Sequence, residues 1–483
     1  MKIRLIVYFL FILPIFSSAE MQYSYKGYFD IGTIHRLSDG SIIKIPYRMA
    51  TLDYTILDNN FYVISSMALE FRLKDIDDIF GSDLSFDLRE LYLEWITSFG
   101  NISLGKQIIT WGSASENNPT DNISPYNYYY LFSMGKERKE GVISLNSNIY
   151  WGYVKLNAIF IPEHNTNILP LNDPEFSINS PIVPTDEQIM EIIDNPFEPF
   201  EYGLSVDFSF GSKDITASYF SGYDRIVSFF GANVWSNQAF LSPIIPDTVL
   251  SYRKTNVYGL GYSALLGDFT FRVDFGYFNT QDNIQDTLDI IRDYEAGKQI
   301  IIEECEGKNV GLPDWANTID CATEPELKET LILDNNARYY QYILEFEFTP
   351  NTEFHLIGQY AKHKAFAFGK ADSLTLSEPI LLYPEDLFVP GMGSPNTFIS
   401  TNALSITALK LFSEIGLELR YTSMYDLDEK GSLHELGIEY EIYENTKILI
   451  AVNKILDNKS IQMNPFTGME DFSHIRLGLK YYY

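Results

Sequence analysis

The sequence predicts an all-β fold, a transmembrane antiparallel β-barrel of about 18 strands with short periplasmic turns and long extracellular loops. Many segments alternate apolar and polar residues with a period of two, which is typical of strands with one oily and one wet face. The connections between these segments alternate between very short and long. Mean hydropathy is −0.09, and no later apolar run reaches the roughly 18 residues of a membrane-spanning helix.

The expected strands pair into hairpins, and they occupy residues 24–34, 46–57, 61–73, 86–98, 101–111, 141–147, 149–161, 200–211, 213–223, 254–266, 268–280, 336–349, 352–365, 402–412, 414–424, 433–443, 446–455 and 472–483. Tight turns such as Asp58-Asn59-Asn60, Gly267 and Glu444-Asn445 join the two strands of a hairpin. The longest of the other connections are residues 112–140, 162–199, 224–253, 281–335 and 366–401. A transmembrane barrel separates its connections by length in this way, whereas a soluble sandwich has no reason to do so.

Several strands indicate which of their faces is wet. In 202–210 the apolar residues Tyr202, Leu204 and Phe208 alternate with serine, glycine and aspartate, and 269–277, 415–421 and 436–442 follow the same pattern. A charged side chain at the middle of a bilayer costs about 2–4 kcal/mol for Arg or Lys and less for Asp or Glu. The charged face must therefore point inward, and so many charges inside a barrel imply enclosed water.

The last residues of the chain form one more alternating strand. Its pattern resembles the C-terminal signal of outer-membrane β-barrels, whose positions are filled here by Arg476, Gly478, Tyr481 and Tyr483. This resemblance implies that the barrel-assembly machinery recognises the C-terminal strand.

Residues 1–19 have the organisation of a secretory signal peptide. Lys2 and Arg4 precede an apolar run of about twelve residues, and Ser17-Ser18-Ala19 provides small residues for cleavage. The remaining residues, 20–483, are expected to form the barrel, and export places it in a bacterial outer membrane.

The charge balance and the cysteines narrow the range of partners. The chain has 65 acidic and 35 basic residues and a net charge of −30, which argues against nucleic-acid binding. Cys305 and Cys321 are expected to form one disulfide in an exported protein. No metal site is expected, because no His lies near them.

The inward face of the expected strands is rich in carboxylates. The candidates for the pore lining are Glu90, Glu94, Asp207, Arg272, Asp274, Glu345, Glu347, Glu418, Arg420, Glu439 and Glu441. Rings of carboxylates favour cations in a channel. The alternative is that these charges keep the pore wet and pair with one another across strands.

Segment 104–141 has the densest motif in the chain. Its key positions are Lys106, Gln107, Trp111, Asn118, Asp121 and Arg138. They resemble a box in a porin-like family of uncharacterised bacterial outer-membrane proteins, which reads Gly-Arg-Gln, Trp-Gly, Asn-Pro-x-Asp and a later Arg. Lys106 stands where that family usually has Arg. Alginate-export and phosphate-selective porins are more distantly similar, in architecture only.

By the strand count this segment contains the third long loop, which porins commonly fold into the pore. Lys106 and Arg138 could then provide positive charge at a constriction, opposite an acidic wall. Alternatively, Asp121 and Arg138 form a buried pair that fastens the loop to the wall. The sequence leaves both hypotheses open.

A wide barrel with a wet interior is expected to be a passive, weakly cation-preferring channel for small solutes, surrounded by outer-membrane lipid. The alternative function is binding or adhesion through the long acidic loops, above all 281–335. No enzymatic activity and no cofactor are expected, because the chain has only six His, and no Ser or Asp is placed near His355 and His363, which share one face of an expected strand. The sequence does not distinguish a monomer from a homotrimer.

Overall fold

The computed structural model describes residues 21–73, 84–115, 117–131, 135–170, 173–176, 200–236, 244–282, 326–332, 336–368, 372–375, 379–382, 388–457 and 466–483. The expected signal peptide and both cysteines lie outside these residues. Among the described residues, no helix is long and apolar enough to cross a membrane.

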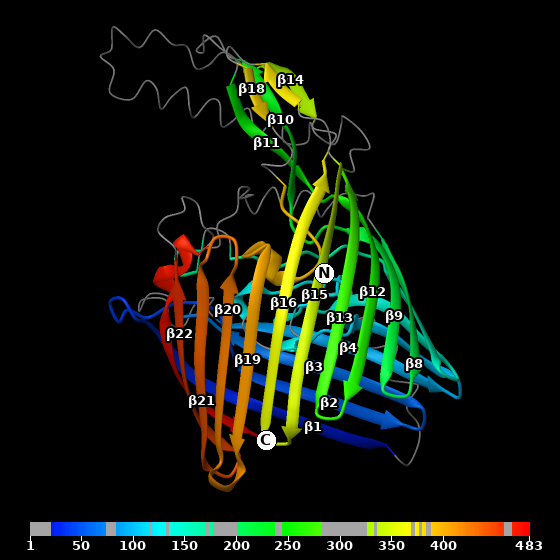
Figure 1. The fold of residues 1–483 in the computed structure, drawn as a ribbon, viewed down its shortest axis with the longest axis vertical. Coiled ribbons are helices and arrows are strands. Elements are labelled where there is room, and N and C mark those ends of the chain that lie inside the picture. Colours follow the sequence, from blue (N-terminus) through cyan, green and yellow to red (C-terminus); the bar gives the residue numbers. More distant parts are fainter. Residues whose placement is uncertain are drawn as a thin grey trace.

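Eighteen antiparallel strands form one closed barrel, as predicted (Figure 1). Strand β1 pairs with β2 on one side and with the C-terminal strand β23 on the other, which closes the sheet. The barrel strands are β1 (Gln22–Arg36), β2 (Tyr47–Asp58), β3 (Phe61–Phe71), β4 (Leu84–Thr97), β5 (Gly100–Gln107), β6 (Val142–Trp151), β7 (Val154–Ile161), β8 (Glu201–Phe210), β9 (Lys213–Tyr223), β12 (Lys254–Leu266), β13 (Phe269–Gln281), β15 (Asn336–Asn351), β16 (Phe354–Ala367), β19 (Asn402–Phe412), β20 (Leu417–Asp426), β21 (Ser432–Tyr443), β22 (Thr446–Leu456) and β23 (His474–Tyr482).

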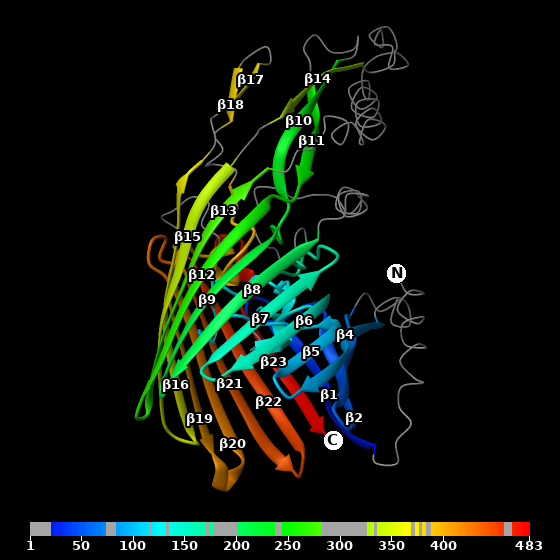
Figure 2. The same cartoon turned by 90° about the vertical axis from the view of Figure 1, so that its right-hand side faces the viewer.

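The remaining described elements belong to the long connections, apart from η7 in the short β19–β20 turn. A three-stranded sheet of β10 (Ser228–Ser236), β11 (Ile244–Ser251) and β14 (Glu326–Ile332) and the hairpin of β17 (Asp372–Thr375) and β18 (Pro379–Leu382) rise beyond one mouth of the barrel (Figure 2). Within the described residues the 3-10 helices are η3 (Tyr128–Tyr130), η4 (Gly135–Arg138), η6 (Pro395–Phe398), η7 (Ser413–Ile415) and η8 (Thr467–Phe472).

Short and long connections lie at opposite ends of the barrel, which we call the turn end and the loop end. Several of the tight turns contain a residue with a left-handed backbone conformation, including Asn59 with φ 54° and Asn445 with φ 62°. Both ends of the barrel sheet, the start of β1 and the end of β23, lie at the turn end (Figure 2).

Two predicted boundaries were wrong. The β6–β7 turn lies at Gly152, with φ +58°, rather than near residue 148, because glycine adopts this left-handed conformation without strain. Strand β5 ends at Gln107 rather than at residue 111, because the chain leaves the wall there and enters the third long loop.

The outward face of the barrel is apolar, and it carries two rows of aromatic rings. Near the loop end successive ring centroids lie 5.2–6.2 Å apart along the series Tyr202, Tyr219, Tyr258, Tyr277 and Phe366. Near the turn end Phe269, Phe346, Phe348 and Phe354 form a second row. Aromatic girdles flanking an apolar band are the pattern of a barrel that spans a membrane.

Candidate functional site

The described residues of the loop between β5 and β6, which are 108–115, 117–131 and 135–141, lie inside the barrel. The loop leaves from β5 and returns to the adjacent strand β6, yet its residues bind the inward face of β13, β15 and β16. Along the wall, the shorter way from β6 to β13 passes through β7, β8, β9 and β12, so the loop crosses the lumen to reach these strands. We call residues 108–141 the lumen loop.

Three wall side chains hold the crossing segment through its backbone and side chains. Asp274 of β13 accepts hydrogen bonds from the backbone N–H of Ser113 at 3.0 Å and of Ala114 at 2.5 Å. Glu345 of β15 accepts from the backbone N–H and hydroxyl of Ser115 at 2.9 and 2.8 Å. These carboxylates satisfy loop donors that would otherwise be buried without partners.

The third of these side chains is Gln359 of β16, whose Oε1 accepts from the side chain of Asn117 at 3.1 Å. Together Asp274, Glu345 and Gln359 form what we call the anchor wall. All three are almost completely buried.

Glycines on the inward face of β12 and β13 allow the loop to lie against the wall. A Cβ added to Gly259 would lie 2.8 Å from Cγ2 of Thr120, and one on Gly276 would lie 3.1 Å from the Pro119 carbonyl oxygen. In the sequence Gly259 and Gly276 look like ordinary strand glycines. The structure shows that their missing side chains leave room for the lumen loop.

Asp121 is the centre of the loop's internal contacts. Its Oδ1 accepts from the backbone N–H of Trp111 at 3.2 Å, and its Oδ2 binds the ammonium of Lys139. The sequence hypothesis had paired Asp121 with Arg138, whose guanidinium instead lies 5.6 Å from the centre of the Tyr126 ring. Burial lowers the pKa of Lys139, which makes the carboxylate partner necessary for its charged form.

The start of the loop is fixed by Trp111 and Asn118. The indole N–H of Trp111 donates to Asn157 of β7 at 2.9 Å. The side-chain oxygen of Asn118 accepts from the backbone N–H and the hydroxyl of Thr120, at 2.9 and 2.8 Å. Both residues of the motif therefore stabilise the loop conformation.

Arg225, which follows β9, clamps the middle of the lumen loop. Its guanidinium donates to both oxygens of the buried Glu201, at 2.9 and 2.7 Å, and to the backbone carbonyls of Asn122 and Ile123, at 3.1 and 3.0 Å. His164 also contacts Glu201, at 2.8 Å. No sequence motif pointed to this cluster, because its members come from three separate connections and one strand.

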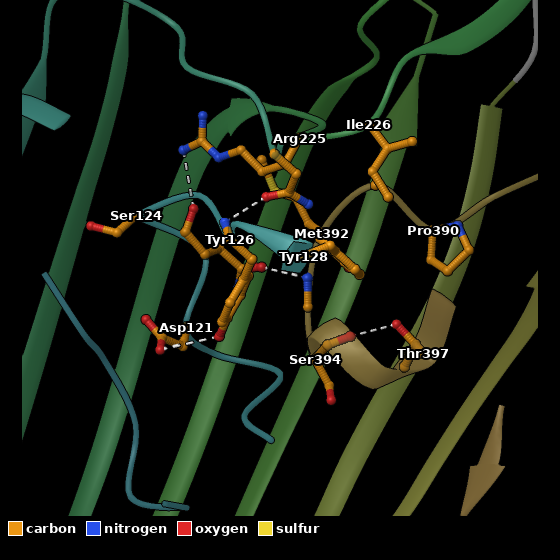
Figure 3. A pocket seen from close by; sticks show the side chains of 14 residues that line it. Asp121, Ser124, Tyr126, Tyr128, Arg225, Ile226, Pro390, Met392, Ser394 and Thr397 are labelled. Atoms are coloured by element: carbon orange, nitrogen blue, oxygen red, sulfur yellow. Dashed lines mark hydrogen bonds between the residues drawn. The ribbon is translucent and has the colours of Figure 1, made fainter. Parts of the chain in front are cut away.

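A fourth connection, residues 388–401, completes the packing. The backbone N–H of Gly393 donates to the side chain of Asn122 at 2.6 Å, and the hydroxyl of Tyr128 donates to the Pro395 carbonyl at 3.1 Å. Figure 3 shows Asp121 to Tyr128, Arg225 and Met392 to Thr397 converging from their separate segments. The space left between them is about 20 Å³, enough for one water molecule.

The end of the loop is bound to the wall of β2 and β4. Glu137 accepts from the guanidinium of Arg48 at 2.8 Å and lies 3.3 Å from that of Arg89. The ammonium of Lys136 lies 3.1 Å from the carboxylate of Glu90. Glu90, a predicted lining residue, also accepts from the backbone N–H of Ile108 at 2.8 Å, so it holds both ends of the loop.

Lys106 and Gln107 lie in the wall rather than at the loop's crossing. Lys106 is in register with the outward-facing Leu91. Its ammonium donates to the Leu88 carbonyl at 2.6 Å, at the point where a β-bulge shifts the register between β3 and β4. Gln107 is buried and donates to the Ser144 carbonyl at 3.0 Å. Neither side chain provides charge at the crossing.

The inward face of β20–β23 differs from the anchor wall, and we call it the open wall. Its charges pair with neighbours on the same or the next strand: Glu418 with Arg420 at 3.0 Å, Glu439 with Lys447 at 3.2 Å, and Arg476 with Asp30 of β1 at 2.7 Å. Glu441 lies beside the β19–β20 turn.

The other predicted lining residues also face inward. Arg272 bridges Glu345, at 2.5 Å, and Glu347. Asp207 lies 3.5 Å from the ammonium of Lys155, and Glu94 accepts from the side chain of Asn101.

A recess of about 240 Å³ lies between the start of the lumen loop and the inward face of β4–β7. Amides and hydroxyls provide most of its lining, which includes Tyr92, Glu94, Asn101, Ser103, Gln107, Trp111, Asn146, Asn148, Lys155 and Asn157. This wall can form hydrogen bonds with water or a hydrophilic solute as both donor and acceptor.

The C-terminal residues close the barrel. Arg476 faces the lumen, whereas Tyr481 and Tyr483 face outward. The hydroxyl of Tyr483 donates to the Thr51 carbonyl at 2.8 Å, and its ring covers Gly27, where a Cβ would lie 2.6 Å from that hydroxyl. Gly478 pairs with Gly32 of β1.

Within the described ranges, no group of three or more His, Cys, Asp or Glu side chains is placed to hold a metal ion. His355 lies 2.8 Å from Glu347 on the inward face, and His363 packs against the Tyr339 ring.

Comparisons with known proteins give fold-level likeness only. No family model and no curated protein matches the sequence. Among solved structures the chain is similar to OccAB1 of Acinetobacter baumannii, with a TM-score of 0.45, 9% identity and 96% of each chain covered. It is also similar to OccAB3 of the same organism, with a TM-score of 0.44, 11% identity, and 96% of this chain and 100% of that chain covered. For the outer-membrane expressed OmpT of Vibrio cholerae the TM-score is 0.36 at 10% identity, covering 97% and 99%.

Proposed function

We propose that this protein is a porin-like channel of the bacterial outer membrane, through which small hydrophilic solutes diffuse passively. The division of the barrel into two faces carries this proposal. The outward face is apolar with two aromatic girdles, and the inward face holds nearly all the carboxylates of the strands. A soluble protein would not expose the first face, and a dry interior would not hold the second.

In this proposal the turn end is periplasmic and the loop end extracellular. Both ends of the barrel sheet lie at the turn end, as expected for an exported chain inserted from the periplasm. The closing strand β23 presents Arg476, Gly478, Tyr481 and Tyr483 to the assembly machinery before it pairs with β1.

The lumen loop sets the size of the pathway. It is fastened to the walls on both sides of the lumen, so solutes pass beside it, along the recess and the open wall. A recess of about 240 Å³ lined by amides and hydroxyls suits small uncharged or positively charged hydrophilic molecules.

The pathway is proposed to prefer cations weakly. On the inward face Glu94 has an amide partner rather than a cation, and among the described residues no cation pairs with Glu441 of the open wall. Carboxylates therefore remain in excess after pairing, and they attract cations.

Two measurements on the purified, refolded protein test the channel. Liposomes containing it should swell in isotonic solutions of small neutral sugars, and planar bilayers should show stepwise conductance with a reversal potential of cation-preferring sign. The heat-unfolded protein is the control. Liposomes that do not swell, together with bilayers that do not conduct, would overturn the proposed function.

A further inference from the structure

Four asparagines lie together on the inward face of three neighbouring strands, in the recess between β4–β7 and the start of the lumen loop. The register places Asn101 of β5 opposite Asn148 of β6, and Asn148 opposite Asn157 of β7. Asn146 is the next inward residue of β6, and all four side chains line the recess. Because asparagine is depleted in strands, strand formation does not account for such a group.

Asn157 fixes the orientation of two of these amides. Its Oδ1 accepts from the indole N–H of Trp111 at 2.9 Å. Its amide NH2 group donates to Oδ1 of Asn146 at 2.6 Å and to Oδ1 of Asn148 at 2.8 Å. The oxygens of Asn146 and Asn148 are therefore occupied, and no described residue accepts from their NH2 groups. These two side chains thus offer hydrogen-bond donors to the recess.

The β4–β5 side of the recess offers acceptors instead. The amide of Asn101 donates to the carboxylate of Glu94, which has no cation partner among the described residues and retains the capacity to accept further hydrogen bonds. The side-chain oxygen of Asn101 is buried and accepts from none of the described residues. A buried acceptor without a donor costs free energy, and a ligand hydroxyl would supply the donor.

The remaining charged groups of the recess already have partners. Glu90 lies 3.1 Å from the ammonium of Lys136, and the ammonium of Lys155 lies 3.5 Å from Asp207. This leaves Glu94 as the one lining charge without a described counter-ion. A single free carboxylate repels anions, so an anionic ligand does not suit the recess.

A cationic ligand does not suit it either. An ammonium donates hydrogen bonds but accepts none, so it would satisfy Glu94 and leave the NH2 groups of Asn146 and Asn148 without acceptors. A hydroxyl both donates and accepts. Neighbouring hydroxyls of one neutral molecule therefore match both sides of the recess.

The size of the recess and its apolar groups fit one sugar ring. Its volume of about 240 Å³ is a little below the range of about 300–1,000 Å³ for sites that bind drug-sized ligands. Tyr92 of β4 and Ile109 and Trp111 of the lumen loop add apolar surface to the amides. A sugar ring carries C–H groups between its hydroxyls, and these groups pack against apolar and aromatic side chains.

We propose that the recess is a saturable binding site for one ring of a neutral saccharide. The sugar hydroxyls accept hydrogen bonds from Asn146 and Asn148 and donate to Glu94 and Asn101. This inference rests on the proposed function in one respect, that the ligand reaches the recess through the lumen. It adds a preferred class of solute to a channel that would otherwise select by size and charge.

Saturation-transfer NMR on the full-length, refolded protein in detergent measures binding without any need for conduction. The probes are D-glucose, D-galactose and D-mannose, compared with D-glucuronate as an anion and ethylammonium as a cation. The variant Asn146→Asp/Asn148→Asp keeps the size of both side chains and the oxygens that accept from Asn157, and it removes the two NH2 donors. Thr422→Asp, which adds a carboxylate to the open wall, controls for charge.

At least one hexose should bind the unchanged protein with a signal that saturates. Loss of two neutral hydrogen bonds should weaken this binding about thirty-fold in the double variant, and Thr422→Asp should bind as the unchanged protein does. Glu94→Gln keeps one acceptor oxygen but loses the charge, so its binding should be about five-fold weaker. Circular dichroism checks that each variant is folded.

Three results would overturn the proposal: no saturable binding of any hexose, equal affinity of the double variant and the unchanged protein, or tighter binding of ethylammonium or glucuronate than of every hexose. Liposome swelling separates this proposal from the proposed channel. Swelling in all three hexoses by a protein that binds none would retain the channel and overturn the binding site. Hexose binding by a protein that does not conduct would retain the binding site and overturn the channel.

Discussion

The anchor wall and the open wall use the same sequence pattern in different ways. Both are inward faces of alternating strands that carry glutamate or aspartate. The side chain of Glu345 on the anchor wall is 0% exposed, whereas those of Glu439 and Arg476 on the open wall are 19% and 33% exposed. The anchor wall gives its acceptors to the lumen loop, and the open wall pairs its charges and leaves them in contact with the lumen.

This difference shows that an inward carboxylate is not necessarily a lining residue. Asp274 and Glu345 were predicted to line the pore, and their oxygens are occupied by loop donors. The barrel therefore assigns two tasks, holding the loop and providing a wet surface, to two neighbouring parts of one wall.

The largest effect is expected when the contacts of Arg225 with Glu201 and the lumen loop are removed. Arg225→Ala leaves the buried carboxylate of Glu201 without its cation and two loop carbonyls without a donor. We expect a loss of about 3–5 kcal/mol in the stability of the loop assembly. Thermal unfolding in detergent, followed by circular dichroism, measures it, with the exposed Arg338→Gln as control. A midpoint equal to the control's would show that the clamp is not needed.

The pH dependence of stability provides a second test of the same side. Burial raises the pKa of Asp224 to about 7, and one of its oxygens has no hydrogen-bond partner. The folded state therefore favours the protonated acid. Its contribution to stability is complete at pH values below about 4 and is lost as the pH rises through 7, by at most about 1.4 kcal/mol per pH unit.

Asp224→Asn should flatten this decline when unfolding midpoints are measured between pH 4 and 8. Burial lowers the pKa of His164, and its effect has the opposite sign, since stability falls when this buried ring must be protonated. Because Asp224→Asn leaves His164 unchanged, the difference between the pH profiles of the two proteins is the contribution of Asp224 alone. An unchanged pH profile in Asp224→Asn would mean that Asp224 is ionised throughout.

A smaller effect is expected for release of the crossing segment. Asp274→Asn weakens the charge-assisted hydrogen bonds that Ser113 and Ala114 donate. A hydrogen bond to a charged group contributes about 1.5–3 kcal/mol to stability. The loop should move more freely, so single-channel conductance should rise and proteases should cleave residues 108–141 faster. The open-wall variant Glu439→Gln is the control. If both variants have the conductance of the unchanged protein, the anchor wall does not limit the pathway.

The smallest effect is expected in ion selectivity. Glu439→Gln and Glu441→Gln remove charge from the open wall, and the reversal potential in a salt gradient should move toward zero. Glu345→Gln, whose side chain is buried, should move it less than either. A larger shift from Glu345→Gln would reverse the assignment of the two walls.

The barrel itself could be predicted because period-two alternation and connection length are local properties of the sequence. Eighteen strands were placed this way, and the two misplaced boundaries lie where the chain turns on a glycine or leaves the wall for the lumen. The contacts of the loop could not be predicted in detail. Lys139 rather than Arg138 pairs with Asp121, and Arg225 reaches Glu201 and residues 122–123 from distant connections. Such contacts depend on how separate loops pack against one another, and the two-residue alternation of the strands contains no information about that packing.

The most direct test of the two-faced barrel compares adjacent residues of β21. Glu439→Cys and Ile438→Cys are introduced with Cys305 and Cys321 replaced by Ser, and the proteins are placed in lipid vesicles. A charged, water-soluble thiol reagent should label position 439, which faces the lumen, and leave position 438 unlabelled in the hydrocarbon. Labelling of position 438 with protection of position 439 would contradict the account.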